Sequence, residues 1–113
     1  MNLSMERLTK QECVIMRVIW GVSDITIQEL KELLATKCEL HYAKSTLMTF
    51  LKHLVSKGFI KTVRKGKESH IYVCIGRSDY VQQVLKDLTD FWFDGDKDAF
   101  IQVIKEQKRR HSI

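Results

Sequence analysis

The sequence predicts a mainly α fold of the α+β class: three helices, a β-hairpin and a further helical stretch, in that order. Two N-terminal capping patterns mark the first two helices, and an apolar stripe at helical spacing marks the third. Two strand candidates flank a Lys-Gly-Lys tip, and in the second of them Ile71, Val73 and Ile75 alternate with Tyr72 and Cys74, which indicates a β-hairpin. This order is typical of a winged helix-turn-helix with a β-hairpin wing and a C-terminal helical extension.

The first two helices open with the same pattern, a threonine followed three residues later by a glutamate. Thr9 with Glu12, and Thr26 with Glu29, are therefore predicted to form capping boxes. The residues after the first box are apolar around most of the helix circumference, so we expect that helix to be largely buried. Gly21 is expected to end it.

A third helix is predicted over residues 43–57, with Gly58 in the left-handed position that commonly follows a helix. Its inward stripe is formed by Leu47, Phe50, Leu51 and Leu54, at the i, i+3, i+4, i+7 spacing of one helix face. The opposite face is polar but has no acidic residue, which is unusual for a face that only meets solvent.

The hairpin is predicted to join residues 59–64 to residues 69–75. After it the pattern becomes helical again, with Ser78 as the expected N-cap and a helix end near residues 94–95. A last amphipathic segment follows, and residues 105–111 are expected to form a basic, frayed tail.

Positive charge is concentrated in one segment of the chain. The formal net charge is +5 at pH 7, and residues 43–70 hold seven basic residues and one acid. The rest of the chain holds 12 basic and 13 acidic residues. A basic segment within a structured region is the electrostatic signature of a polyanion partner. On charge alone, a merely solvated face stays open.

The outward face of the third helix fits the major groove of double-stranded DNA. That groove is about 12 Å wide, accepts one helix and pairs with polar and cationic side chains. Hydroxyl groups would bond phosphates or base edges, lysines would supply charge, and Met48 would make apolar contact. The basic wing tip would contact the adjacent backbone. A winged helix that binds only other proteins is the alternative. The residues predicted to bind DNA are Lys44, Ser45, Thr46, Met48, Thr49, Lys52 and His53 on the helix, and Arg64, Lys65 and Lys67 on the wing.

The stretch after the wing carries more apolar side chains than so small a domain can cover. We expect them to form a homodimer, because one recognition helix rarely makes enough base contacts for specificity. Packing onto the first helix is the alternative for some of them. Residues 1–76 are thus predicted to form a winged-helix DNA-binding domain, and residues 77–113 a helical dimerisation region. The residues predicted to dimerise are Val84, Leu85, Leu88, Phe91, Trp92, Phe93, Phe100, Ile101 and Ile104.

Other classes of protein are not indicated. The sequence lacks a P-loop, G-x-S-x-G, His-Glu-x-x-His and a glycine-rich dinucleotide turn, so we expect neither an enzyme nor a cofactor. Three dispersed cysteines and four dispersed histidines do not have the spacing of a metal site. No apolar run approaches the roughly 20 residues that span a bilayer, and no signal peptide is evident. A cytoplasmic protein without a membrane partner is expected.

Three segments together carry a family resemblance. Leu8–Trp20, Ser45–Ile60 and Ile71-Tyr72 are similar to the opening helix, the recognition helix with its entry into the wing, and the returning strand of the BlaI/MecI/CopY repressors. The chain therefore resembles this family of bacterial, penicillinase-repressor-like winged-helix repressors, most clearly over residues 8–75.

The resemblance implies homodimers that bind inverted-repeat operators built on TACA/TGTA and block transcription of resistance-type genes. By position, Ser45, Thr46, Met48, Thr49 and His53 correspond to the family's groove-facing residues. Met48 and His53 stand where an arginine is common in the family. The bidentate contact that such an arginine makes to guanine is lost, so the operator of this chain need not be the family's TACA/TGTA sequence.

The resemblance also bears on induction. The copper-responsive branch has C-terminal Cys-x-Cys motifs, whereas no cysteine follows Cys74 here, so copper sensing is not expected. In the β-lactam branch a membrane sensor-protease cuts the dimerisation helices, typically at Asn-Phe. The aligned pair here is Gln102-Val103. A sensor-protease is thus an implied partner, and another trigger is equally open.

Overall fold

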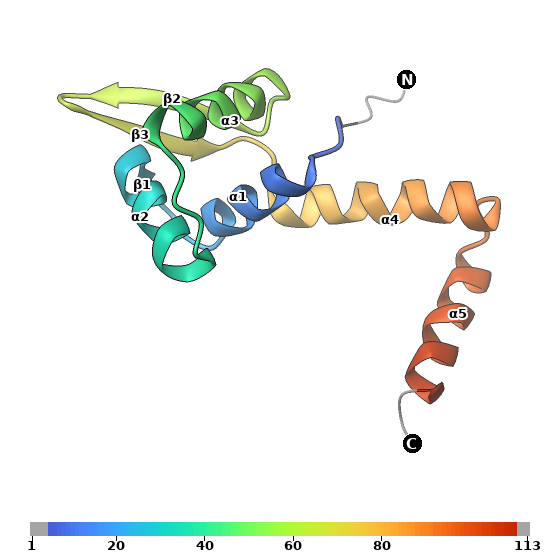
Figure 1. The fold of residues 1–113 in the computed structure, drawn as a ribbon. Coiled ribbons are helices and arrows are strands. Elements are labelled where there is room, and N and C mark those ends of the chain that lie inside the picture. The colour runs from blue at the N-terminus through green and yellow to red at the C-terminus, as the bar shows by residue number, and fades with distance from the viewer. Residues whose placement is uncertain (1–4, 111–113) are drawn as a thin grey trace. The chain divides into compact units, whose positions relative to one another are not determined.

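A computed structural model describes residues 5–110 (Figure 1). The chain divides into two compact units, and the division falls between Arg77 and Ser78. No helix within residues 5–110 has the length and apolar character needed to cross a membrane. In chain order the elements are α1 (Lys10–Trp20), β1 (Ile25–Thr26), α2 (Ile27–Cys38), α3 (Lys44–Ser56), β2 (Ile60–Lys65), β3 (Glu68–Val73), α4 (Arg77–Phe93) and α5 (Lys97–Arg110).

Both predicted capping boxes are confirmed at the starts of α1 and α2. The hydroxyl of Thr9 accepts a hydrogen bond from the Glu12 N–H at 3.2 Å, and the Glu12 carboxylate accepts one from the Thr9 N–H at 2.9 Å. Thr26 and Glu29 make the same two bonds at 3.1 and 2.9 Å. Each box satisfies two N–H groups that the first helical turn leaves without a partner.

The core of the first unit lies between α1, α2, α3 and the sheet. The stripe predicted on α3 is confirmed at Leu47, Leu51 and Leu54, which are fully buried. Phe50 is only half-buried, and its ring centroid lies 5.4 Å from that of Tyr42. The remaining fully buried apolar side chains of this core are Ile15, Met16, Ile19, Leu30, Leu34, Phe59 and Ile60.

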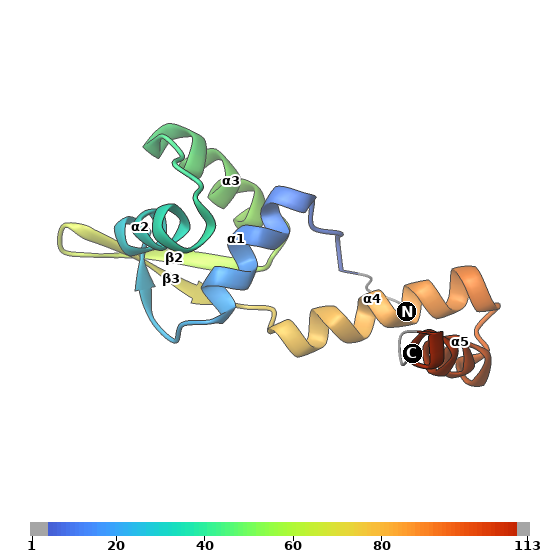
Figure 2. The same ribbon diagram turned by 60° about the horizontal axis from the view of Figure 1, so that its bottom comes forward.

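The sheet has three antiparallel strands in the order β1-β3-β2, one more than the sequence predicted. β1 pairs with β3 so that Ile25 lies opposite Ile71, and both side chains are buried. A two-residue strand is too short to show alternation, so only this long-range pairing reveals it. β2 and β3 form the predicted hairpin, which projects beyond the helices (Figures 1 and 2).

The C-terminal helices differ from expectation at two places. α4 begins at Arg77, so Ser78 lies within the first turn and the prediction that it caps the helix is wrong. α5 continues to Arg110, so the tail predicted to fray is helical up to that residue, and His111 lies outside the described residues. Asp96 starts α5 by accepting a hydrogen bond from the Ala99 N–H at 3.1 Å. Between the helices, Asp94 and Gly95 have positive φ and turn the chain, near the predicted helix end.

Candidate nucleic-acid interface

The outward face of α3 is open to solvent along its whole length. Of the seven residues predicted there to bind DNA, six are exposed and Met48 is half-buried. The Thr49 hydroxyl donates a hydrogen bond to the carbonyl oxygen of Ser45 at 3.1 Å, which leaves the lone pairs of that hydroxyl free to accept. No acidic residue lies in α3, so nothing on the helix opposes an anion at its positive N-terminal end.

A hollow of about 350 Å³ lies between the first turns of α2, the start of α3 and the tip of the hairpin. Four cationic side chains line it, Lys31, Lys44, Arg64 and Lys67, against a single acid, Glu68. The fold therefore gathers positive charge from three separate segments around one concave surface. Because like charges repel, such an arrangement favours an anionic partner.

Lys31 and Gln28 line this hollow from α2 but were not among the sequence-predicted site residues. They lie three residues apart near the start of α2, and thus on the same side of the helix. α2 is the first helix of the helix-turn-helix, and the spacing of Gln28 and Lys31 along it was the sequence signal that could have identified them. The prediction assigned DNA contacts only to α3 and the wing.

The hairpin presents its basic residues on two different faces. Side chains alternate along a strand, and Thr62 lies opposite the buried Ile71, so Arg64 lies on the face that is turned toward the helices. Lys65 lies on the opposite face, where its Nζ is 5.2 Å from the centroid of the Tyr72 ring. Interaction with the Tyr72 side chain raises the pKa of Lys65 above its ordinary value. The structure thus joins Arg64 and Lys67 to the hollow and separates Lys65 from it.

A buried carboxylate ties the C-terminal end of α3 to α1. Glu12 is 2% exposed, and one of its oxygens accepts a hydrogen bond from Lys57 Nζ at 2.6 Å. Burial raises the pKa of Glu12, but the hydrogen bond from Lys57, those from Thr9 and the Lys57 charge outweigh it. The pKa of Glu12 is therefore below its ordinary value. His53 Nδ1 lies 4.0 Å from the other Glu12 oxygen, which places His53 beside this anchor.

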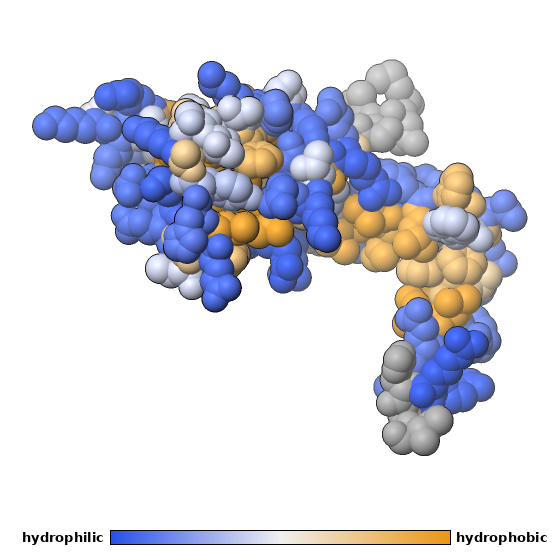
Figure 3. All heavy atoms as spheres, viewed as in Figure 1, coloured by the Kyte–Doolittle hydropathy of each residue, from blue (hydrophilic) through white to orange (hydrophobic). Residues whose placement is uncertain are grey.

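The second unit carries the residues predicted to dimerise. Phe91 and Trp92 are 75% and 71% exposed, and their rings meet edge to face at 4.9 Å. Phe93 of α4 packs against Phe100 of α5, with ring centroids 5.5 Å apart. On the face drawn in Figure 3, apolar surface covers part of α4 and the start of α5. Of the predicted set, Leu85, Phe91, Trp92, Ile101 and Ile104 are exposed, and Val84, Leu88, Phe93 and Phe100 are half-buried.

Comparison with known proteins identifies the family. The model of the penicillinase repressor family matches residues 8–111. The chain belongs to the penicillinase repressor family. This confirms the resemblance seen in the sequence and extends it through the C-terminal helices. Penicillinase repressors are a family of DNA-binding repressors and not of enzymes.

Solved structures support the assignment of this chain to the penicillinase repressor family. The DNA-binding domain of the repressor BlaI is 26% identical and superposes with a TM-score of 0.58, covering 67% of this chain and 90% of that one. Monomeric BlaI from Bacillus licheniformis, in complex with the blaP half-operator, is also 26% identical, with a TM-score of 0.56 and the same coverage. A third similar structure is a mutant MarR from E. coli in complex with operator DNA. It is 20% identical, has a TM-score of 0.56 and covers 92% of this chain and 76% of that one. At this identity the similarity supports the fold only.

One curated relative is an uncharacterised 16.5 kDa protein encoded in the ptsI 3′ region of Latilactobacillus sakei. This relative is 26% identical to the chain over 81 residues, which are 72% of the chain. The chain spans about half the length of this relative, since the match covers 54% of it.

Proposed function

We propose that this chain is a homodimeric transcriptional repressor that inserts α3 into the major groove of an inverted-repeat operator. The observation that carries the proposal is the cationic hollow, in which Lys31, Lys44, Arg64 and Lys67 converge beside an acid-free helix face. A phosphate backbone that follows the hollow would neutralise charges from α2, α3 and the wing together. BlaI, which shares the fold, has been solved in complex with its half-operator, and this supports DNA as the partner.

The exposed face of α3 supplies both base contacts and phosphate contacts. Ser45 and Thr46 present hydroxyl groups that can donate or accept, whereas the Thr49 proton is engaged by the Ser45 carbonyl oxygen. Thr49 would therefore act as an acceptor, toward the amino group of adenine or cytosine. Lys44 and Lys52 would bind phosphates, and Met48 would contact a thymine methyl.

The ends of this interface have different roles. Arg64 and Lys67 would clamp the adjacent backbone from the wing, which positions the protein without specifying sequence. Lys65 belongs to the opposite face of the hairpin, so its predicted phosphate contact would be peripheral. His53 lies nine residues beyond Lys44, or roughly 13 Å along the helix, and would meet the far edge of the groove.

Dimerisation would use the apolar side chains of α4 and α5. Seven large hydrophobic side chains in this unit are more than a third exposed, a large area for so small a protein. Burial against a second copy would remove this area from water. The resulting two-fold symmetry suits half-sites about one helical turn apart, roughly 34 Å. The second unit would thus serve as the dimerisation region predicted over residues 77–113, and the first unit as the DNA-binding domain predicted over residues 1–76.

Repression would follow from occupancy of the operator, in the cytoplasm, at genes of the resistance type. Induction would follow from separation of the protomers, because the two half-sites then lose their coupling. Cleavage by a sensor-protease at Gln102-Val103, which are exposed on α5, is one route to that separation. A second route is separation of the protomers by another trigger, and both routes would act on the dimer interface.

The experiment starts from selection of duplexes out of a randomised pool, followed by footprinting of the selected sequence. Thr49→Ala with Lys52→Ala should weaken binding of the selected duplex by at least about tenfold, since a base contact and a phosphate contact are lost. Lys61→Ala is the matched control, because Lys61 is basic and exposed but lies with Tyr72 on the outer face of the hairpin. No preferred duplex at any ionic strength would refute the proposal and leave a protein-binding winged helix.

A further inference from the structure

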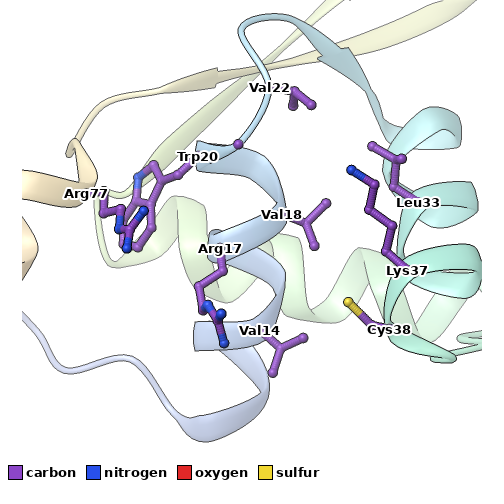
Figure 4. A pocket seen from close by; sticks show the side chains of 10 residues that line it. Val14, Arg17, Val18, Trp20, Val22, Leu33, Lys37, Cys38 and Arg77 are labelled. Atoms are coloured by element: carbon purple, nitrogen blue, oxygen red, sulfur yellow. The ribbon is translucent and has the colours of Figure 1, made fainter.

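A second concave surface lies on the first unit, across α1 and the C-terminal half of α2 (Figure 4). It has a volume of about 350 Å³ and shares no lining residue with the cationic hollow. Its floor is apolar and half-buried, so it can hold a hydrocarbon group. The apolar lining is Val14, Val18, Val22, Leu33 and Trp20. We call this surface the α1–α2 groove.

The rim of the α1–α2 groove is cationic. Arg17, Lys37 and Arg77 line it, and none of its ten lining residues is acidic. All three cations are exposed, and none forms an ion pair with a carboxylate within residues 5–110. The groove therefore combines three cationic side chains with an apolar floor and no acidic side chain.

The groove is built from fixed elements. Val14, Arg17 and Val18 of α1 and its C-cap Gly21 follow the i, i+3, i+4, i+7 spacing that places them on one face. The indole N–H of Trp20 donates a hydrogen bond to the Ile75 carbonyl oxygen at 2.9 Å, which holds that aromatic wall in place. A preformed concave site with apolar walls and a few polar groups is the usual form of a small-molecule site, and about 300 Å³ is the lower end of the usual size.

We propose that the α1–α2 groove binds a small amphipathic carboxylate. The hydrocarbon part would cover Val18 and Leu33, whereas the carboxylate would meet the cationic rim. Arginine suits this role because its planar guanidinium can bind a carboxylate through two parallel hydrogen bonds. A purely hydrophilic anion would leave the apolar floor in water, and a neutral hydrocarbon would leave the rim unpaired.

The test uses naphthalene-2-carboxylate as the probe and the full chain as the protein. Calorimetric titration should show binding, and the methyl NMR signals of Val14, Val18, Val22 and Leu33 should shift. Naphthalene-2-carboxamide, which has the same shape without charge, should bind about tenfold more weakly. Arg17→Gln and Lys37→Gln should each weaken carboxylate binding by about the same factor. Both side chains are exposed, so the fold is expected to survive, and circular dichroism checks this.

Two controls separate this site from general attraction to a basic protein. Lys10→Gln removes a charge from α1 outside the groove and should leave binding unchanged. Val18→Phe should fill the floor and abolish binding. The proposal is overturned if the probe does not bind, if the amide binds equally well, or if the NMR shifts map to the hollow around Lys44. Carboxylate binding as tight as that of the native chain in Arg17→Gln or Lys37→Gln would overturn it too.

Discussion

Replacement of Glu12 by glutamine tests how α3 is held in position. The buried Glu12 carboxylate accepts hydrogen bonds from Lys57 Nζ at 2.6 Å and from the Thr9 N–H at 2.9 Å. Glutamine keeps the shape and an acceptor oxygen but removes the charge. Lys57 is therefore left beside a neutral group, and its side chain is only 18% exposed.

The cost follows from the change in hydrogen-bond type. A hydrogen bond to a charged group contributes about 1.5–3 kcal/mol net, and a neutral one contributes about 0.5–1.5 kcal/mol. The bond from Lys57 to residue 12 therefore loses about 1 to 1.5 kcal/mol. The partly buried ammonium adds to this because it loses its counter-charge, so the total loss of unfolding free energy is about 2 kcal/mol.

Glu29→Gln is a closely matched control. Glu29 closes the same capping box in α2, with the same hydrogen bond from a threonine N–H at 2.9 Å. It is exposed, however, and no lysine pairs with it within the described residues. This substitution should cost less than about 0.5 kcal/mol, as is usual for the surface.

The same pair predicts a dependence on pH. The pKa of Glu12 in the folded state lies below its ordinary value of 4.5, so the ionised group contributes stability that is fully present above that value. This contribution is lost as the pH falls through the folded-state pKa. The unfolding free energy of Glu12→Gln should therefore fall less steeply below pH 4.5 than that of the native chain.

Urea denaturation at one fixed protein concentration measures both effects. A Trp92→Phe background leaves Trp20, in the first unit, as the one tryptophan that reports by fluorescence. If Glu12→Gln costs no more than Glu29→Gln, or keeps the native dependence on pH, the anchor described here does not stabilise the fold.

Three further predictions concern the wing, the dimer and one turn. Arg64→Gln should weaken binding to a selected duplex, because one phosphate contact is lost, and it should reduce the slope of log affinity against log salt by about 1. Lys65→Gln should change the affinity and the slope less. Phe91→Ser with Trp92→Ser should weaken dimerisation by on the order of a thousandfold, measured by sedimentation, because four large apolar side chains per dimer are lost. Gly58→Ala should lower the unfolding free energy by about 1 kcal/mol, since φ is +83° and an alanine there is strained although nothing lies within 4 Å of its Cβ.

Each of these has its own control and contrary result. Equal effects at positions 64 and 65 would mean that the two hairpin faces do not differ toward DNA. Val63→Ser, an exposed apolar change on the wing, should leave the oligomeric state unchanged, and a dimer that survives the change at 91 and 92 would place the interface elsewhere. Gly21→Ala, where φ is −78°, should cost much less than the change at Gly58, and an equal cost would exclude backbone strain as the cause.

Much of the local structure could be predicted from the chain itself because it depends on residues three or four positions apart. The capping boxes at Thr9 and Thr26 need only a threonine and a glutamate at fixed spacing. The turn at Gly58 needs only a residue that tolerates positive φ, and the buried stripe of α3 needs only helical periodicity. Short-range steric and hydrogen-bonding rules suffice for these features, so the order of the helices and of the β2–β3 hairpin followed from the sequence.

The remaining features depend on contacts between distant residues, and only the tertiary structure decided them. The pairing of Ile25 with Ile71 created a third strand, and the contact between Glu12 and Lys57 joined α1 to the end of α3. The cationic hollow likewise includes Lys31, and its spacing from Gln28 places both on one side of α2 but does not show that this side faces α3 and the wing. A stretch of sequence specifies its own backbone preferences, but which side chains meet across the core depends on how all the elements pack together.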